Sequence, residues 1–541
     1  MKYIILIFLF SFLFFGNSFS QEKDKTEPQK RKLFIEAHKH LQLDDVPLAL
    51  QTFLSLYELD SINANVNYLI GYCYFSLENE TDKIKSIPYL IKALTSISEE
   101  YSEGIYKEKN ASVKTYHYLA QAYFIDYKFE EAIKYFTEYR KYVSDPKELE
   151  EVEQLTLYAI NGKNLILTPV KIDIFNLGET INSEYDDHSP VTNISETKMV
   201  FTSKRKGSTG NLKTTDGQYF EDIYVSHKSD GKWGTPEKIS HNINTMEHEA
   251  SIALSVDGDE LFIYKDDVGE GGNLYRSFYE NEDWSKPEKL GSNINTEFDE
   301  GHATISPDGR TLYFTSNRRG GYGGFDVYYV NRLPDGQWGL AQNLGTGINT
   351  KYDEGGPFIH QDGTTLYFSS KGYNSMGGYD LFYTIMKDNG TFSKPENLGY
   401  PINTIGDDVF YILSADGKRA YYSSERDDSY GGKDIYLMDL VSLPERSLVV
   451  VSGNIVKQSN KEVVNGAVLT VKDSKTGKII GAFKPNKSTG KYLLVLPKAK
   501  SLYKISCNVG EFVNDELKLP TNSSFYYLQK PVVINPIGEL K

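Results

Sequence analysis

A repeat of about 54 residues in the middle of the chain constrains its fold more than any other feature. The tripeptide Ile-Asn-Thr or Ile-Asn-Ser recurs five times between residues 170 and 440. The intervals between successive copies are 62, 51, 54 and 54 residues, and their isoleucines are Ile181, Ile243, Ile294, Ile348 and Ile402. Self-similarity at a fixed period indicates an architecture built from one supersecondary unit, repeated.

A complete copy contains the signals of four short strands. In the third copy, the turn sequence Ser306-Pro307-Asp308-Gly309 leads into the apolar run Leu312–Ser316. Asp-Gly is typical of a hairpin because both central turn residues adopt positive φ. A Gly-rich turn and a strand that begins with Asp or Asn follow, and an aromatic residue opens the last strand of four copies. This pattern predicts one β-propeller blade per copy, and therefore five blades.

The two ends of the repeat region predict how the ring closes. The fifth copy lacks its last strand after Leu440, whereas an unassigned strand, Ile172–Leu177, precedes the first copy. We expect this N-terminal strand to complete the fifth blade. The Gly-rich turns at 318–324 and 375–379 lead from strand to strand without a following helix, so they are predicted to be blade turns and not phosphate-binding loops.

Helical spacing of apolar residues characterises the region from about residue 32 to residue 144. Small and aromatic residues recur there at intervals of 12 and then 4, in the sets Ala37, Ala49, Phe53 and Ala120, Ala132, Phe136. Gly71 lies 34 residues after Ala37. A 34-residue period with small residues where helices cross resembles the tetratricopeptide repeat, which implies an α-helical solenoid with a concave binding surface.

Alternating strands without the 54-residue period occupy the last part of the chain, from about residue 447 to residue 537. Their order resembles the carboxypeptidase-regulatory-like, transthyretin-like β-sandwich. The predicted fold is therefore multidomain, with a signal peptide at 1–20, a tetratricopeptide-repeat helical domain at 21–165, a five-bladed WD40-like β-propeller at 166–445 and the sandwich at 446–541.

The N-terminus predicts export. A basic Lys2 precedes the uncharged run Tyr3–Phe15, and small residues follow at Ser18 and Ser20, as in a secretory signal peptide. The run is too short to span a bilayer, which takes about 20 residues. No cysteine stands near the cleavage point, so we expect no lipid anchor. The two cysteines, at 73 and 507, fall in different predicted domains and imply no disulfide framework.

Charge and motif content argue against several functions. With 74 Asp and Glu against 59 Lys and Arg, the net charge is −15, which disfavours nucleic acid as a partner. The sequence contains no Gly-x-Ser-x-Gly elbow, no His-Glu-x-x-His zinc helix and no Gly-x-x-x-x-Gly-Lys phosphate loop. We therefore predict that the protein is not an enzyme and uses no organic cofactor.

An acidic residue stands six positions after every repeat isoleucine. These residues are Asp187, Glu249, Glu300, Glu354 and Asp408. Equivalent positions of a propeller form a ring around its axis, and a ring of carboxylates attracts hard cations such as calcium, or basic peptide segments. The alternative is that each carboxylate accepts hydrogen bonds from turn amides or from a hydroxyl of the next blade.

The domain order resembles exported cell-envelope proteins of Bacteroidetes-type bacteria, and the propeller repeats resemble those of the periplasmic propeller of the Tol system. The family implies a scaffold in the periplasm, at the outer membrane or at the cell surface, whose partners belong to the envelope or to type IX secretion or gliding machinery. Its members continue into an outer-membrane-protein-A-like domain after the sandwich, so we expect no direct peptidoglycan binding here. The alternative is a carbohydrate-binding or carbohydrate-active propeller.

Overall fold

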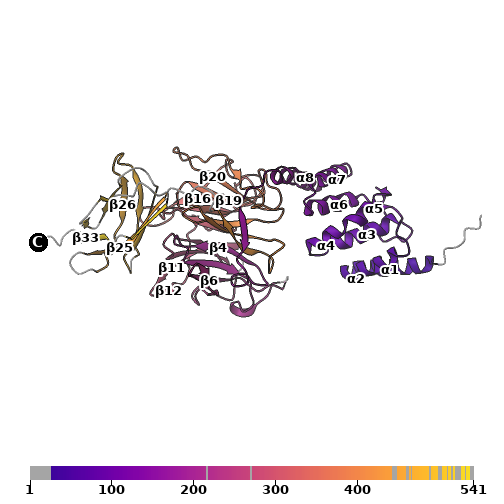
Figure 1. Ribbon diagram of the computed structural model, residues 1–541, viewed down its shortest axis with the longest axis horizontal. Helices are drawn as coiled ribbons and strands as arrows, with labels where there is room; N and C mark the ends of the chain where they lie inside the picture. Colours follow the sequence, from indigo (N-terminus) through magenta and orange to yellow (C-terminus); the bar gives the residue numbers. More distant parts are fainter. Residues whose placement is uncertain are drawn as a thin grey trace, which may run out of the picture. The chain divides into compact units, whose positions relative to one another are not determined.

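The computed structural model describes residues 26–214, 217–267, 271–440, 448–457, 462–464, 466–486, 489–497, 503–508, 510–512, 516–517, 525–529 and 532–536. The predicted signal peptide lies outside these residues. Two compact units, Met1–Thr156 and Leu157–Lys541, make up the chain (Figure 1). The division falls inside helix α8 (Pro146–Ile166), earlier than the boundary expected at residue 165.

The first unit is a stack of helices. Its members are α1 (Glu27–Gln42), α2 (Val46–Tyr57), α3 (Ala64–Phe75), α4 (Glu80–Lys85), α5 (Ile87–Ala93), α6 (Lys114–Ile125), α7 (Phe129–Tyr139) and the first part of α8. Side-chain caps begin some of them: Asp45 accepts a hydrogen bond from the Leu48 N–H, and Asn63 caps α3 in the same way. From α1 to α7, each helix contacts the next one in the stack.

Small residues lie where these helices cross, as the sequence predicts. A Cβ added to Gly71 in α3 would stand 2.5 Å from Cγ of Leu90 in α5, so no larger residue fits there. Ala37, Ala49, Ala120 and Ala132 are all fully buried. The region is helical as expected, and its assignment to the tetratricopeptide class stays a prediction. Within the described residues, no helix is both long and apolar enough to cross a membrane.

Five antiparallel sheets follow, one for each sequence repeat. In order of the chain, with the innermost strand first, they are β4 (Asp187–Thr192), β5 (Lys198–Ser203), β6 (Asp222–Ser229), β7 (Lys232–Trp233) and β8 (Glu237–Lys238); β9 (Glu249–Leu254), β10 (Glu260–Asp267), β11 (Gly271–Glu280), β12 (Asp283–Trp284) and β13 (Glu288–Lys289); β14 (Glu300–Ile305), β15 (Thr311–Ser316), β16 (Asp326–Asn331) and β17 (Gln342–Asn343); β18 (Glu354–Ile359), β19 (Thr365–Ser370), β20 (Asp380–Ile385) and β21 (Glu396–Asn397); and β22 (Val409–Leu413), β23 (Arg419–Ser424), β24 (Asp434–Asp439) and β3 (Asp173–Asn176).

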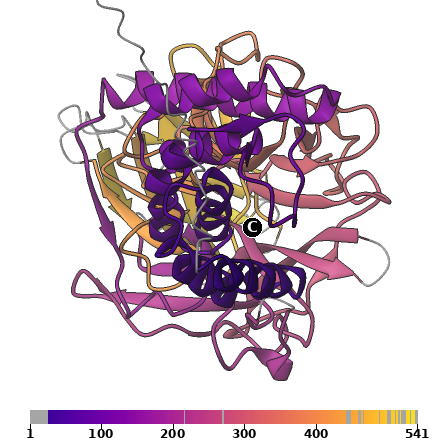
Figure 2. The same cartoon turned by 90° about the vertical axis from the view of Figure 1, so that its right-hand side faces the viewer.

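The sheets close into a ring. Each innermost strand contacts the next, from β4 through β9, β14, β18 and β22, and β22 contacts β4 again. In the view of Figure 2 the sheets surround a common centre. The predicted closure is confirmed, because β3 pairs antiparallel with β24 as the fourth strand of the last blade. The second unit is therefore built around a five-bladed propeller.

A partly buried ion pair supports the same closure nearer the axis. Glu196, in the first hairpin turn of blade one, accepts hydrogen bonds from Nε and Nη2 of Arg419 in β23 at 2.9 and 2.8 Å. The hydroxyl of Tyr421 donates to the same carboxylate at 3.1 Å. Blades five and one are thus joined both by a strand at the rim and by a charged pair near the centre.

The last part of the second unit is a mostly antiparallel sheet arrangement centred on β25 (Leu448–Lys457). The first half of β25 pairs with β28 (Lys491–Pro497) and β32 (Phe525–Gln529), and its second half pairs with β33 (Val532–Pro536). The remaining strands are β26 (Leu469–Asp473), β27 (Ile479–Phe483), β29 (Tyr503–Cys507), β30 (Gly510–Phe512) and β31 (Glu516–Leu517). Its likeness to the transthyretin-type sandwich stays a prediction.

The closing strand offers a test with its own control. Ile174 pairs with Met438 and packs against the buried cluster of blade five, whereas its neighbour Phe175 is 51% exposed. We expect Ile174→Asp to lower the free energy of unfolding of the second unit by about 3 kcal/mol, because it places a charge against apolar side chains. Phe175→Asp is expected to cost less than about 1 kcal/mol. Equal losses in calorimetry would contradict closure by β3.

Candidate functional site

The acidic ring predicted from the sequence consists of five fully buried carboxylates. Four are the first residue of an innermost strand, and Asp408 immediately precedes its strand. Each one accepts hydrogen bonds from the Ser or Thr of its own Ile-Asn-Ser/Thr loop. In blade three, for example, Glu300 accepts from the N–H of Thr296 at 2.7 Å and from its hydroxyl at 2.8 Å. The carboxylate therefore fixes the loop that enters its blade.

The second strand of each blade supplies further partners. Serine hydroxyls donate to Glu300, Glu354 and Asp408 at 2.7, 2.8 and 2.7 Å, from Ser316, Ser370 and Ser424. Basic side chains reach Asp187, Glu249 and Glu300 at 2.6, 3.0 and 3.2 Å, from Arg205, Lys265 and Arg318. The hydrogen-bonding alternative supposed a hydroxyl of the next blade. These hydroxyls belong instead to the same blade as the carboxylate.

The structure does not bring the five carboxylates together at one point. Each is bonded within its own blade, and nothing among the described ranges forms a group of three or more His, Cys, Asp or Glu able to hold a metal ion. The described residues therefore offer no calcium site at the ring, and calcium binding there stays a prediction.

Burial changes the ionisation of this ring. It raises the pKa of Glu354 to about 7 and that of Asp408 to about 6, and it also raises the pKa of Glu249. Hydrogen bonds from Thr350 and Ser370 to Glu354 oppose the shift without cancelling it. No cation pairs with Glu354 among the described ion pairs, which distinguishes it from Glu300 in the preceding blade.

The residue before each ring carboxylate joins adjacent blades. At four of the five junctions it is an aspartate whose Oδ1 accepts a backbone N–H from the preceding blade. The four bonds are Gly272 to Asp299 at 2.8 Å, and Phe325 to Asp353, Tyr379 to Asp407 and Lys433 to Asp186 at 3.0 Å each. These contacts explain why the loop repeats so strictly in sequence.

The Gly-rich turns are blade turns, as predicted, and the same aspartates explain their glycines. A Cβ on Gly324, Gly378 or Gly432 would overlap a carboxylate oxygen, of Asp353, Asp407 and Asp186 respectively. A Cβ on the glycine that precedes each of them would overlap a backbone carbonyl oxygen of the next loop. These turns contain glycine because the following blade presses against them.

The junction between blades one and two departs from this rule. His248 stands where the other junctions have aspartate, and its Nδ1 lies 3.7 Å from Oε2 of Glu221. Nε2 of His188 and Nζ of Lys204 approach Oε1 of the same carboxylate at 3.5 and 3.9 Å. Sequence reasoning missed Glu221. The available signal was the 62-residue first interval, whose extra residues lie in the loop that delivers this side chain.

The histidine–glutamate cluster is electrostatically coupled. Burial opposes ionisation of Glu221, but the nearby side chains of His188, His248 and Lys204 outweigh it and hold its pKa below the usual range. The proximity of the Glu221 carboxylate in turn raises the pKa of His248. His188 also contacts Phe410, whose ring lies 5.6 Å away, and Phe410 contacts His302 at 4.9 Å. Burial lowers the pKa of His302 to about 4.

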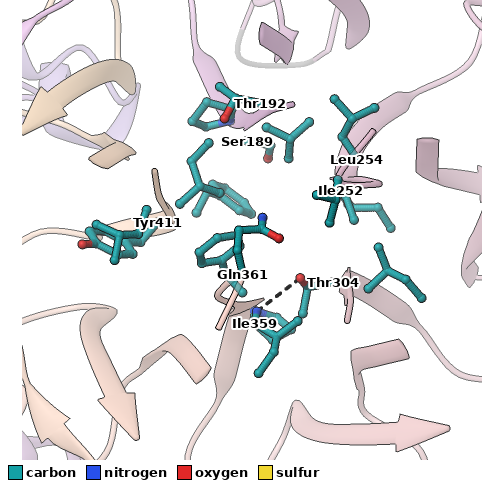
Figure 3. A pocket seen from close by; sticks show the side chains of 18 of the residues that line it. Ser189, Thr192, Ile252, Leu254, Thr304, Ile359, Gln361 and Tyr411 are labelled. Atoms are coloured by element: carbon teal, nitrogen blue, oxygen red, sulfur yellow. Dashed lines mark hydrogen bonds between the residues drawn. The ribbon is translucent and has the colours of Figure 1, made fainter. Parts of the chain in front are cut away.

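A cavity on the axis lies beyond Phe410 and His302. It has a volume of about 50 Å³ and is lined from every blade, mainly by aliphatic side chains such as Ile252, Leu254 and Ile359. Figure 3 shows the amide of Gln361 reaching between them, and its buried Oε1 has no hydrogen-bond partner. This volume holds a few water molecules. Ligand pockets are typically about 300–1,000 Å³.

Among known proteins, this chain is similar only to solved structures. No family model matches the chain, and no curated protein matches its sequence. TolB from Acinetobacter baumannii is 15% identical, covers 53% of this chain and 69% of that chain, and has a TM-score of 0.32. CoXyl43, a GH43 beta-xylosidase/alpha-arabinofuranosidase from a compost microbial metagenome, is 12% identical, covers 49% and 93%, and has a TM-score of 0.35. Likenesses at these TM-scores carry no conclusion about function.

The junction glycines can be tested with a single methyl group. Gly378→Ala directs a Cβ at the Asp407 carboxylate that accepts the Tyr379 N–H, so we expect a loss of about 1–3 kcal/mol in the free energy of unfolding. Gly347→Ala is the control, because nothing lies within 4 Å of a Cβ there. It should change stability by less than about 0.5 kcal/mol. The free energy of unfolding of both variants is measured in urea. Equal values for Gly378→Ala and Gly347→Ala would contradict the close contact with Asp407.

The raised pKa of Glu354 predicts a pH dependence. The folded protein retains a proton that the unfolded chain releases between pH 4.5 and about 7, so stability falls as the pH rises through this range. Glu354→Gln keeps the shape and cannot ionise. Relative to the wild type, this variant should gain up to about 3 kcal/mol of stability between about pH 5 and pH 8. The exposed Glu237→Gln should show no such gain, and parallel curves for Glu354→Gln and wild type would refute the assignment.

Proposed function

We propose that the chain is a non-catalytic exported scaffold that binds other proteins of the cell envelope. One observation carries the proposal: the polar residues that recur in every blade are used inside the protein. The ring carboxylates bind their own loops, and the preceding aspartates bind the adjacent blades. Because these repeated polar side chains bond within and between the blades, they are not available to act on a substrate. The outer surfaces of both units remain available for binding partners.

The carbohydrate-active alternative finds less support. The axial cavity of about 50 Å³ is too small for a sugar ring with its hydroxyl groups. Trp284 and Trp338 are only 4% and 7% exposed, and they pack within the blades. They are therefore not free to stack on a glycan. Glu221, the acid–base candidate at the junction of blades one and two, is enclosed by His188, His248 and Lys204.

The kind of partner follows from the family resemblance of the sequence. Helical repeats, a Pro-Asp-Gly propeller and a regulatory-like sandwich in this order are typical of envelope proteins, some of them associated with type IX secretion or gliding. We infer a location in the periplasm, at the outer membrane or at the cell surface.

Co-purification tests the scaffold directly. Tagged full-length protein, cross-linked in cells and recovered from envelope fractions, should retain defined envelope proteins through stringent washing. The same protein is expected to leave a panel of aryl glycosides and polysaccharides unchanged.

Turnover has its own control. Hydrolysis that co-purifies with wild-type protein through two different purification tags would overturn the non-catalytic proposal. Its loss in Glu221→Gln would assign the activity to the histidine–glutamate cluster, and its persistence would assign it to another site. Recovery of no stable envelope partner would refute the scaffold.

A further inference from the structure

A segment of the first unit folds back over the helices that precede it. Between α5 and α6 the chain makes an excursion from Ile97 to Ser112, which we call the strap. Its ends meet in a short parallel pair, β1 (Ile97–Ser98) with β2 (Ala111–Ser112). Loops closed in this way are compact, and they are held by their own side chains and by what they cover.

The strap covers one face of α1 and α3 with two tyrosines. The ring of Tyr106 lies 5.6 Å from that of Phe34 in α1, and the ring of Tyr101 lies 5.5 Å from that of Tyr68 in α3. Both pairs are edge-to-face, an arrangement that stabilises aromatic contacts beyond simple burial. We call Phe34, Asn65 and Tyr68 the covered face.

Asn65 binds the strap as it would bind a peptide. Its side chain donates to the carbonyl of Glu108 at 3.2 Å and accepts from the hydroxyl of Tyr101 at 2.8 Å, and its backbone N–H donates to the carbonyl of Lys109 at 3.2 Å. Asn65 is fully buried, and the other residues from Ala64 to Gly71 are buried as well. The buried side chain of Asn65 therefore has its polar partners in the strap.

One polar group near the covered face remains unsatisfied. His38, one turn after Phe34, is 9% exposed and its Nε2 has no hydrogen-bond partner. Its ring lies 4.7 Å from that of Phe34, and burial lowers its pKa although Glu103 of the strap acts in the opposite direction. A segment that offered His38 a hydrogen bond would satisfy this region better than the strap does.

The outer side of the strap contributes little to its attachment. Glu99, Glu100 and Glu103 are exposed, Ile105 is 53% exposed, and the one ion pair of Lys109, with Asp60, is largely solvent-accessible. Such pairs add about 0–1 kcal/mol. The strap is therefore held by the two tyrosines, by the contacts of Asn65 and by its buried end at Ala111 and Ser112, which packs against α3.

We propose that the covered face is a peptide-binding surface that the chain occupies with its own strap. The partner it fits is a protein segment with two aromatic side chains five residues apart, backbone carbonyls opposite Asn65 and a hydrogen-bonding group for His38. Binding requires release of the strap. The proposal rests on the scaffold function above and identifies one surface that would serve it.

The test uses full-length protein and a fluorescent synthetic peptide that copies residues 99–110. A tethered strap has an effective concentration in the millimolar range, so micromolar peptide should not displace it from wild-type protein. The double variant Tyr101→Ala, Tyr106→Ala should release the strap and bind the peptide at least 10-fold more tightly. Ile105→Ala, in the same segment but solvent-facing, is the matched control and should behave as wild type.

Hydrogen exchange of the same samples shows whether the variant remains folded. Amides of 99–110 should exchange faster in the double variant, while those of α6 and α7 keep wild-type protection. If α6 and α7 lose protection, Tyr101→Ala alone replaces the double variant and should show an intermediate gain in peptide binding. Equal binding by wild type, control and a folded variant would overturn the proposal. That result together with intact envelope co-purification would exclude this surface and leave the scaffold function standing.

Discussion

A carboxylate that accepts a backbone N–H across a blade junction is the interaction on which the second unit depends. Hydrogen bonds to charged groups contribute about 1.5–3 kcal/mol each, and four of the five junctions contain one. The outermost strands β17 and β21 have only two residues each, so pairing at the rim adds little. The aspartates in turn require glycine opposite them and a loop fixed by the buried acid that follows. One local contact thus accounts for three of the recurring sequence signals.

The junction that breaks this rule shows how the same geometry accommodates a different pair. Where the other loops bring an acid to a backbone amide, the loop before β9 brings His248 to the side chain of Glu221. At this junction the acid, Glu221, comes from the preceding blade, and its partner, His248, comes from the following blade. Three basic groups surround Glu221, so its charge is compensated locally and the junction stays closed despite the long loop in blade one.

Much of this fold was predictable because the repeat carries redundant information. Asp-Gly hairpins, alternating strands and an orphan strand before the first copy together define blade number and closure, and β3 lies where that reasoning places it. Side-chain direction was not predictable. Equivalent positions in a ring can converge on the axis or turn into their own blades, and the ring acids do the latter because a Thr or Ser four residues earlier captures each one. Glu221 and the strap were missed for a related reason, since both lie in insertions that the repeat does not describe.

Closure by β3 has a consequence for the order of folding. Asp173–Asn176 pairs with Asp434–Asp439, so the first strand of the propeller receives its partner only after the fifth repeat has been made. Until that pairing forms, Ile174 lacks the buried cluster that covers it, and β24 is the open edge of the fifth blade. Contacts this distant in sequence slow folding. We therefore expect the hydrogen bonds that join the two ends of the ring to be among the last to form.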